Sequence, residues 1–531
     1  MTAAVSPAAL RGMLGDGGEL ALIDVREELI YSQGHLLLAR SAPLSRLELK
    51  FVQAVPRRTT RIVLCDGGDG LAERGAAVLA RSGYSDLRIL SGGIEAWAAA
   101  GFELFTGVNV PSKAFGEFIE HADGTPNIAA DALARLIGNG ADLVVLDSRP
   151  FDEYARVSIP GATNVPGAEL VLRARELAPS PDTMVVVNCA GRTRSIIGAQ
   201  SLINAGLPNK VVALRNGTMG WSLAGLSCDS EKNRRAPGVS HDKLDWAKNA
   251  ARRVAQACGV EFIAHAELED LRRDDSRTLY LFDVRDPAEY AAGHLTGAIS
   301  APGGQLVQAT DQYVGTLGAR LVLVDDLEVR AAMTGSWLRQ MGFADVYVVA
   351  EAGSETGWPA IPVLENDTCP QAAIEAKALA DLLSRNAATV VDLSLSRNYL
   401  AGHIPGAWFA IRTRLQGALK NIPIAETFVL TSEDGVLAEL AVSEAANLID
   451  RVRFLKGGNA AWQAAGQPLS TAPNLADEPV DQWRKPYERS GDIKAAMQDY
   501  LAWEVDLLPR IQRDGSLPFE RFRPRLAAEV R

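Results

Sequence analysis

The chain has 531 residues, of which 47% are hydrophobic and 22% charged, and its net charge is −11. This length and composition are typical of a globular α/β protein with about three or four domains, and the acidic balance disfavours nucleic acid as a partner. No run of about 18 uncharged apolar residues predicts a membrane span, and the first residues lack the pattern of a secretory signal. Five cysteines without a CxxC pair argue against a disulfide framework and a zinc site, so we expect a reducing, cytoplasmic location and no metal.

The first segment of the chain contains a predicted strand that ends in an acid, Leu22-Ile23-Asp24. A Gly-His pair follows at Gly34-His35, and the segment closes on a glycine turn and Trp97. Between them lies the loop Cys65-Asp66-Gly67-Gly68-Asp69-Gly70, which has a thiol, two acids and no arginine. Acids beside a thiol raise its pKa and repel anions, so Cys65 is predicted to be an accessory or structural thiol rather than a nucleophile.

The second segment has a strand ending at Asp147 and a closing Trp221, with Val157-Ser158 in place of the Gly-His pair, and it has the most informative loop. The apolar run Met184-Val185-Val186-Val187 predicts a buried parallel strand, and Ile196 to Leu202 a helix. Between them lies Asn188-Cys189-Ala190-Gly191-Arg192-Thr193-Arg194-Ser195. Backbone N–H groups converge where a short loop opens a helix, and they stabilise an anion. With Arg192 and Arg194 nearby, Cys189 is predicted to be a nucleophilic thiolate, the alternative being a buried inert cysteine.

The stretch that follows belongs to neither neighbouring segment. Residues 228–238 are polar, and Ser240 is placed to cap a helix that runs to Cys258, with Gly259 as its stop. We interpret residues 237–258 as a helical connector that divides the protein into two pairs of domains in series.

The third and fourth segments repeat the pattern without a cysteine in the loop. Their strands end at Asp283 and Asp392, and their loops are Asp325 to Arg330 and Ser432 to Leu437. An aspartate or a serine cannot form a persulfide, so both loops are predicted to be inactive.

Beyond residue 472 the chain becomes rich in acids and prolines. Ile493, Met497, Tyr500, Leu501, Leu507 and Leu508 form an apolar stripe that predicts a helix ended before Pro509. We expect this helix to pack back on the domains rather than to bind a partner.

Spacing tests whether the four segments are one repeat. From Asp24, Asp147, Asp283 and Asp392, the loop position lies 41, 42, 42 and 40 residues further on, at Cys65, Cys189, Asp325 and Ser432. From these positions to Trp97, Trp221, Trp358 and Trp462 there are 32, 32, 33 and 30 residues. Agreement within three residues at two spacings indicates a genuine internal repeat.

The length of the Cys189 loop narrows the chemistry. Cysteine-dependent phosphatases place five residues between cysteine and arginine, whereas here the second arginine comes one residue sooner and Ser195 takes the phosphatase position. The smaller ring suits one sulfur atom better than a phosphoryl group. The loop and the repeat resemble those of the rhodanese sulfurtransferases.

This resemblance implies an α/β fold made of four tandem rhodanese-like domains, each a parallel sheet flanked by helices, plus a helical C-terminal tail. The domains are expected at residues 1–108 (doubtful activity), 109–236 (catalytic), 259–365 (inactive) and 366–472 (inactive), with the tail at 473–531. It also implies that inactive units line the neighbouring active site.

Other residues of the second domain are candidates for supporting roles. Arg149 resembles a family arginine near the sulfur donor, but an ion pair with Asp147 that orients loops is an equal alternative. His35, His294 and His403 are expected to stabilise turns, and Trp221 to lie in the core. Cys228, Cys258 and Cys369 fall outside the loops and are expected to be bystanders.

The predicted function is sulfur transfer through a Cys189 persulfide, from thiosulfate or a similar small anionic donor to a thiol, a protein acceptor or cyanide. Ala190, Gly191, Arg192, Thr193, Arg194, Ser195 and Arg149 are the predicted substrate-binding residues, and Cys65 is a possible second thiol. No cofactor, nucleic acid or membrane is expected to take part. The alternatives are a non-catalytic sulfur-binding or scaffold protein, and a 3-mercaptopyruvate sulfurtransferase, whose Gly-Ser/Thr-Gly loop pattern this chain does not match.

Overall fold

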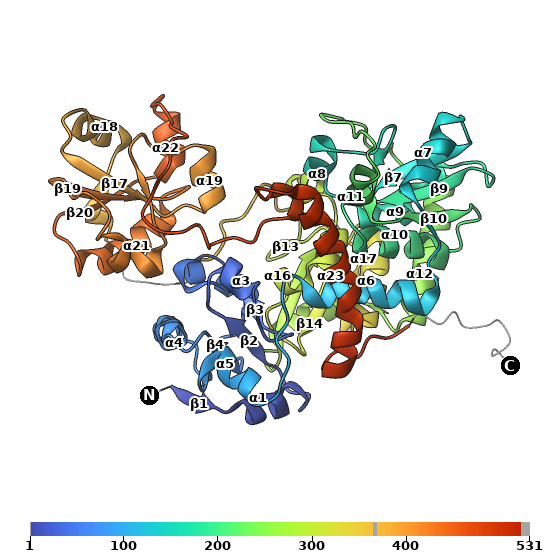
Figure 1. Cartoon of the computed structure of the whole chain (residues 1–531). Coiled ribbons are helices and arrows are strands. Elements are labelled where there is room, and N and C mark those ends of the chain that lie inside the picture. Colours follow the sequence, from blue (N-terminus) through green and yellow to red (C-terminus); the bar gives the residue numbers. More distant parts are fainter. Residues whose placement is uncertain (1, 365–368, 522–531) are drawn as a thin grey trace. The chain divides into compact units, whose positions relative to one another are not determined.

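The computed structural model describes residues 2–364 and 369–521 (Figure 1), and the expected boundary between residues 365 and 366 lies outside them. Within this range the chain forms four parallel sheets with one topology. In the first, the strand order is β1-β5-β4-β2-β3, and the same order recurs in the other three. The fourth sheet gains an edge strand, β21 (Asn474–Leu475), which pairs parallel with β18 (Trp408–Phe409). The expected four α/β domains are confirmed.

Domain 1 consists of β1 (Ala3–Val5), α1 (Pro7–Leu14), β2 (Ala21–Asp24), α2 (Glu28–Tyr31), β3 (Arg40–Ser41), η1 (Leu44–Arg46), α3 (Leu47–Ala54), β4 (Ile62–Cys65), α4 (Leu71–Arg81), β5 (Leu87–Leu90) and α5 (Gly93–Ala99). Domain 2 consists of α6 (Val110–Asp123), β6 (Asn127–Ile128), α7 (Ala130–Gly138), β7 (Leu143–Asp147), α8 (Phe151–Arg156), β8 (Thr163–Asn164), η2 (Gly167–Glu169), α9 (Leu170–Leu177), β9 (Met184–Asn188), α10 (Thr193–Asn204), β10 (Val211–Leu214) and α11 (Gly217–Leu223). The connector helix is α12 (His241–Ala257).

Domain 3 consists of β11 (Glu261–Phe262), α13 (His265–Arg273), β12 (Leu279–Asp283), α14 (Pro287–Ala292), β13 (Ile299–Ser300), α15 (Gly303–Gln308), α16 (Thr310–Tyr313), β14 (Arg320–Val324), α17 (Val329–Gln340) and β15 (Val346–Val349). Domain 4 consists of η3 (Pro370–Ala372), β16 (Ala373–Ile374), α18 (Ala376–Ser384), β17 (Ala388–Asp392), α19 (Ser396–Ala401), β18, η4 (Arg412–Arg414), α20 (Leu415–Ala418), β19 (Thr427–Thr431), α21 (Val436–Ala446), β20 (Val452–Leu455), α22 (Gly458–Ala464) and β21. The tail contributes η5 (Pro486–Glu488) and α23 (Ile493–Asp514).

The central strands are apolar because helices cover both faces of each sheet. All residues of β4 and β14 are buried, as are the last four of β9. Strands of this kind read as continuous apolar runs rather than alternating ones. Each central strand therefore delivers its last residue, and the loop after it, to the same edge of its sheet, where helices begin.

The connector helix does not separate two halves of the chain. Domains 1 and 4 form one compact unit (Met1–Leu10, Ala21–Val108 and Ile361–Arg484), and domains 2 and 3 form the other (Arg11–Leu20, Asn109–Ala360 and Lys485–Arg531). The expected division into consecutive pairs is therefore wrong. Helix α12 packs against α9 of domain 2 and α17 of domain 3, and its buried alanines join a core that both domains share.

The tail helix packs on domain 2, as expected, with α23 against α6. The sequence predicts that this helix ends before Pro509. Instead, α23 continues to Asp514 and contains that proline. Buried Leu507, Leu508 and Ile511 flank the proline, and this packing offsets the lost hydrogen bond. No helix among the described residues is long and apolar enough to cross a lipid bilayer.

The repeated histidines and tryptophans are mostly structural, as predicted. His35, His294 and His403 are buried, and each stacks on a tyrosine with ring centroids 3.9, 4.0 and 3.9 Å apart. Trp97, Trp221 and Trp462 are buried in helices that follow the last core strand. Trp358 is 63% exposed, because domain 3 has no helix after β15 among the described residues.

Candidate active site

Cys189 lies directly after β9, in a loop that opens α10. Its side chain is buried, with the residue 2% exposed, and its Sγ–H donates to the Oγ of Ser195 at 3.4 Å. The Ser195 hydroxyl in turn donates to the carbonyl of Arg192 at 2.8 Å, which closes the loop on itself. Ala190 fixes the loop to α11, because its carbonyl accepts from the backbone N–H of Met219 at 3.0 Å. The thiol is thus held at the start of a helix, where free amides gather.

Strand register identifies the residue that each domain places at the Cys189 position. Asp147 pairs with Asn188, the residue before Cys189. The corresponding pairs in the other domains join Asp24 to Cys65, Asp283 to Val324 and Asp392 to Thr431. The position of Cys189 is therefore occupied by Asp66 in domain 1, Asp325 in domain 3 and Ser432 in domain 4.

This register corrects the expectation that Cys65 stands in the active-loop position. Cys65 is the last residue of β4, and its Sγ–H points back into the sheet toward the carbonyl of Ile23 at 3.5 Å. Burial, first of all, and the nearby Asp24 raise the pKa of Cys65 well above its ordinary value. The sequence spacing was one residue short because the domain 1 loop begins at Asp66.

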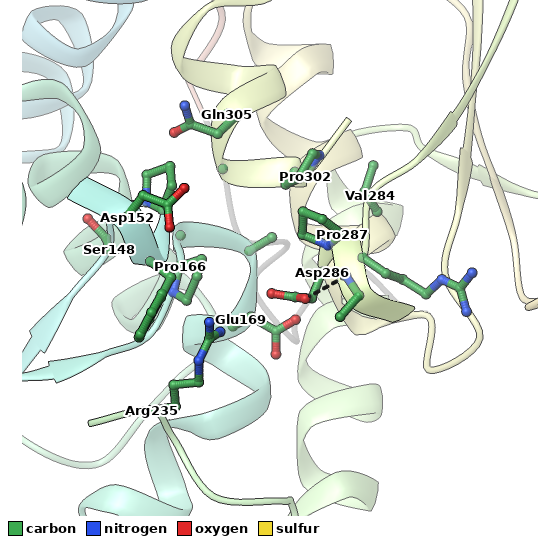
Figure 2. Close-up of a pocket in the computed structure, with 18 residues that line it drawn as sticks. Ser148, Asp152, Pro166, Glu169, Arg235, Val284, Asp286, Pro287, Pro302 and Gln305 are labelled. Atoms are coloured by element: carbon green, nitrogen blue, oxygen red, sulfur yellow. Dashed lines mark hydrogen bonds between the residues drawn. The ribbon is translucent and has the colours of Figure 1, made fainter. Parts of the chain in front are cut away.

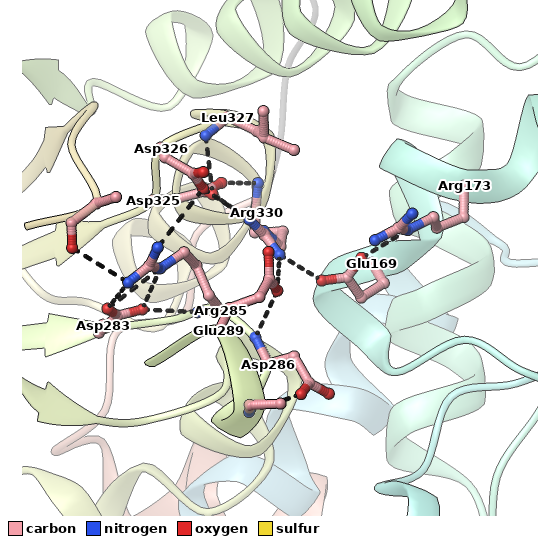
Figure 3. A network of polar contacts seen from close by, with 12 residues as sticks. Glu169, Arg173, Asp283, Arg285, Asp286, Glu289, Asp325, Asp326, Leu327 and Arg330 are labelled. Carbon is pink, nitrogen blue, oxygen red and sulfur yellow. Dashed lines mark hydrogen bonds and ion pairs between the residues drawn. The ribbon is translucent and has the colours of Figure 1, made fainter. Parts of the chain in front are cut away.

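In domain 3 the loop binds a side-chain anion, the carboxylate of Asp325. The Asp325 carboxylate accepts the backbone N–H of Leu327 at 3.1 Å, of Arg330 at 2.7 Å and of Ala331 at 3.3 Å. The Arg330 guanidinium adds contacts at 2.7 and 3.0 Å to the same carboxylate (Figure 3). A side-chain anion thus lies inside a nest of amides backed by a buried cation.

Domains 1 and 4 fill the same nest with their own side chains. Asp66 accepts from the N–H groups of Gly68 at 2.8 Å and Ala72 at 2.9 Å. The Ser432 hydroxyl oxygen accepts from the N–H of Ala438 at 3.3 Å. These donors lie two and six residues after the nucleophile position, as Leu327 and Ala331 do in domain 3.

In domain 2 the equivalent amides belong to Gly191 and Ser195. An aspartate carries its oxygens two bonds beyond Cβ, and a cysteine persulfide carries its outer sulfur at the same remove. A side-chain anion two bonds beyond the Cβ of Cys189 would therefore meet amides equivalent to those that the Asp325 carboxylate meets in domain 3. This correspondence is the main geometric indication of the chemistry of the loop.

Arg194 is the cation that the structure places beside the thiol. It contacts Glu153 at 2.9 Å and the side-chain oxygen of Gln305 at 3.0 Å. Burial lowers the pKa of Arg194, but the charges of Glu153 and Cys189 raise it by more, so the guanidinium stays charged. Burial also opposes ionisation of Glu153, yet Arg194 and Lys485 hold the pKa of that carboxyl well below its usual range.

The surroundings of Arg330 repeat those of Arg194. Arg330 contacts Glu289 at 2.6 Å within its own domain and Glu169 of domain 2 at 2.9 Å (Figure 3). Glu153 and Glu289 each lie six residues after the conserved strand-end position, and the other two domains have Ile30 and Asn398 there. Sequence reasoning missed both glutamates, although they occur only where the loop ends in arginine.

Arg192 does not offer a free charge to the sulfur, contrary to expectation. Its guanidinium contacts Glu117 at 2.6 and 2.7 Å, Glu120, and the side-chain oxygen of Asn216 at 3.2 Å. Burial lowers its pKa, and the bonded Glu117 raises it by more. Arg192 therefore ties the loop to α6 and α11, and its charge is neutralised there.

Arg149 is held in a buried ion pair with Asp147, at 2.8 and 2.6 Å, and donates to the carbonyl of Val157 at 2.6 Å. The pairs Arg26–Asp24 and Arg285–Asp283 repeat this geometry in domains without a cysteine at the loop position. This recurrence supports the structural interpretation of Arg149.

The tail covers the Cys189 loop, which the sequence did not predict. The buried Glu504 of α23 contacts Lys113 at 3.1 Å and accepts from the hydroxyl of Tyr500 at 3.1 Å. A Cβ on Gly191 would lie 2.9 Å from the Met219 side chain and 3.2 Å from the Glu504 carboxylate, so a larger residue here would have to displace the ends of both side chains. Thr193 is buried, and its hydroxyl donates to Glu504 at 3.5 Å. Lys485 contacts Glu153 at 3.0 Å, which links the tail to Arg194.

The other cysteines, Cys228, Cys258 and Cys369, are free and lie away from the loops. No group of three or more histidine, cysteine or acidic side chains suited to a metal occurs in the part of the chain that the structure describes.

Comparison with known proteins agrees with this architecture. A family model described as the rhodanese-like domain matches residues 6–100, 129–224, 264–355 and 375–465. A crystal structure of a thiosulfate sulfurtransferase from Pseudomonas aeruginosa is 47% identical, covers 98% of this chain and 100% of that chain, and superposes with a TM-score of 0.95.

More distant relatives match parts of the chain. The thiosulfate sulfurtransferase of Pseudomonas aeruginosa PAO1 is 28% identical over 230 residues, which cover 36% of this chain and 83% of the relative. The putative sulfur carrier protein YrkF of Bacillus subtilis is 26% identical over 137 residues, 24% of this chain and 72% of the relative. The four matched stretches span most of the chain, which therefore belongs to the rhodanese family of sulfurtransferases.

Proposed function

We propose that this protein transfers sulfur from thiosulfate to a thiol acceptor through a persulfide on Cys189. The Cys189 thiolate attacks the outer sulfur of thiosulfate, the S–S bond of the donor breaks, and sulfite leaves with its electron pair. An acceptor thiolate, or cyanide in an assay, then bonds to the outer sulfur and Cys189 departs as the thiolate. The relatives named thiosulfate sulfurtransferases support this choice of donor.

One observation carries the proposal. Asp325 places an anion in the amide nest of domain 3, at the position where Cys189 stands in domain 2. The same framework that holds a carboxylate would hold a persulfide anion. Asp66 and Ser432 occupy the other two nests, so domain 2 has the single working site.

Arg194 stabilises negative charge on the donor and on the leaving sulfite. Its guanidinium is buried, permanently charged and close enough to Cys189 to interact with it electrostatically. Arg192 keeps the loop in shape through Glu117 and Glu120. The proposed reaction needs no metal or organic cofactor, and free cysteines fit a reducing, cytoplasmic setting.

Intact mass spectrometry tests the proposal directly. Brief exposure to thiosulfate should add one sulfur per chain, and cyanide should remove it. Cys189→Ser should abolish both the mass gain and turnover, while the matched variant Cys258→Ser should retain them. A folded, reduced protein that gains no sulfur would contradict the proposal and favour a scaffold role. Gain from 3-mercaptopyruvate but not from thiosulfate would reassign the donor.

A further inference from the structure

A cavity of about 330 Å³ lies between domains 2 and 3, within the compact unit that both domains form. Its walls come from the loops after β7 and β8 in domain 2 and from the equivalent loops after β12 and β13 in domain 3 (Figure 2). Prolines and Phe151 supply apolar lining. The volume is at the lower end of the range for small-molecule sites, so the ligand must be small.

The cavity adjoins the machinery around Cys189. Gln305 lines it and accepts a hydrogen bond from Arg194 at 3.0 Å. Gly167 and Gly303 line both this cavity and a smaller one that Arg194 borders. Ser148 lines the cavity too, and its hydroxyl donates to the carbonyl of Asn188, next to Cys189. A molecule bound here therefore meets Gln305, the side chain that contacts Arg194, while Cys189 itself lines neither cavity.

Charges of both signs face the cavity. Asp152 and Asp286 enter from opposite domains, and Arg235 rises between them (Figure 2). The Arg235 guanidinium stacks on Phe151, 3.5 Å from the ring centre. Neither Asp152 nor Arg235 forms an ion pair among residues 2–364 and 369–521. Glu169 and Arg285 also line the cavity. Arg330 and Arg173, each at 2.9 Å, already neutralise Glu169, and Asp283 at 2.6 Å neutralises Arg285.

This charge pattern discriminates between the two substrates of a sulfurtransferase. Two carboxylates repel thiosulfate, a dianion, so the cavity does not suit the donor. An ammonium group is complementary to Asp152 and Asp286, and a carboxylate is complementary to the planar guanidinium of Arg235. The apolar walls between them suit a short carbon chain.

We propose that this cavity is the acceptor site and that it takes a small zwitterionic thiol, one with both an ammonium and a carboxylate group. The inference rests on the sulfur transfer proposed above. The acceptor thiolate forms a bond to the outer sulfur of the persulfide, the S–S bond to Cys189 breaks, and its electron pair stays on the Cys189 thiolate. The product is the persulfide of the acceptor, and the step needs no oxidant or reductant.

Three thiols separate the contributions of the two charges. Cysteine has both groups, cysteamine lacks the carboxylate, and 3-mercaptopropionate lacks the ammonium. In Asp152→Asn/Asp286→Asn, kcat/KM for cysteine relative to 3-mercaptopropionate should fall about tenfold. In Arg235→Ala, kcat/KM for cysteine relative to cysteamine should fall by about the same factor. Asparagine remains a good helix cap, so replacing Asp286, which caps α14, preserves the fold.

Matched variants at exposed positions outside the cavity are Asp275→Asn and Arg234→Ala, and both selectivity ratios should keep their wild-type values there. Unchanged ratios in the cavity variants would overturn the acceptor site, even if thiosulfate still loads one sulfur onto the protein. If thiosulfate loads no sulfur onto wild-type protein, the proposed function itself fails. Binding of S-methylcysteine to Cys189→Ser protein, measured by calorimetry, gives a readout independent of turnover, and it should weaken in the cavity variants.

Discussion

The loops of domains 2 and 3 have the same framework but different side chains at the key position, a thiol in domain 2 and a carboxylate in domain 3. Each follows the central strand, each ends in an arginine five residues after the key position, and each arginine contacts a glutamate of its own domain and a side chain of the other. In domain 3 the nest is permanently filled by Asp325. In domain 2 the same position has the Cys189 thiol, which donates to the Ser195 hydroxyl.

The comparison indicates that one side chain distinguishes the two loops, a thiol in domain 2 and a carboxylate in domain 3. Arg330 forms ion pairs with Asp325, Asp326 and two glutamates. One of these glutamates belongs to domain 2, so the arginine links domain 3 to domain 2. Arg194 has Glu153 as its carboxylate partner and remains available to an anion on Cys189. The carboxylate of Asp325 therefore has the charge arrangement that the proposed persulfide on Cys189 would create in domain 2.

Exchanging the two side chains tests this comparison most severely. Cys189→Asp should abolish sulfur transfer, a loss of at least about a thousandfold, because the nucleophile is gone. The variant should fold, since the backbone N–H groups of Gly191 and Ser195 can donate to a carboxylate as the equivalent groups of domain 3 do. Circular dichroism and thermal unfolding check the fold.

The reverse exchange, Asp325→Cys in a Cys189→Ser background, should let thiosulfate load one sulfur, more slowly than in the wild type. Arg330 favours the thiolate, but Asp326 and Glu328 repel the donor. Peptide mapping by mass spectrometry locates the sulfur. If no sulfur is gained at any thiosulfate concentration, the nest and its arginine are not sufficient for the chemistry.

The second prediction concerns stability. Arg330→Met should lower the free energy of unfolding by about 3–5 kcal/mol, because it leaves the fully buried Asp325 without its cation. Chemical denaturation measures the change. Adding Asp325→Asn should recover part of the loss, since an amide needs no counter-charge. If the double variant is no more stable than Arg330→Met, Asp325 is not the partner that matters.

Much of this fold and site could be predicted from the sequence. The strand-end aspartates and the loop spacing identified four equivalent units, and Cys189 stood out because its loop alone combines a thiol with two arginines. Local pattern is sufficient for such features, since each strand-loop-helix unit is a local structure.

Long-range partners could not be predicted in this way. Arg192 and Arg194 are two residues apart, yet one points to α6 and the other to Glu153 and Gln305. Which domains pair is decided by the shared core around α12, and no local pattern reports it. The one-residue error at Cys65 arose because spacing counts residues, whereas strand pairing decides which residue ends the strand.

The two arginines of the Cys189 loop provide the third prediction. Arg194→Ala should reduce kcat/KM for thiosulfate by a factor equivalent to about 1.5–3 kcal/mol, because it removes a charge-assisted contact to the donor. It should also slow the loading of sulfur from thiosulfate, since the dianionic donor loses a neighbouring cation. Intact mass spectrometry at timed intervals after thiosulfate addition reports this rate.

Arg192→Ala should act on stability instead. It leaves the buried Glu117 without its partner, at a cost of about 2 kcal/mol in unfolding free energy, with a smaller effect on the rate of sulfur loading than Arg194→Ala. Equal slowing of sulfur loading in the two variants would remove the distinction between a loop-positioning arginine and a sulfur-facing one.

The smallest effect is expected at Cys65, the residue whose position most resembles Cys189 in sequence and least in structure. Cys65→Ser should keep turnover within about twofold of wild type, because the hydroxyl can still donate to the carbonyl of Ile23 and no step passes through this side chain. In the folded wild-type protein at neutral pH, iodoacetamide should modify Cys189 well before Cys65, whose pKa is raised by burial. Peptide mapping after timed alkylation ranks the two thiols, and denatured protein, in which both react, is the control. Sulfur found on Cys65 after thiosulfate treatment would mean that a thiol inside the sheet can take up sulfur without the amide nest. Occupation of the other nests by Asp66, Asp325 and Ser432 would then not explain why the protein has a single site.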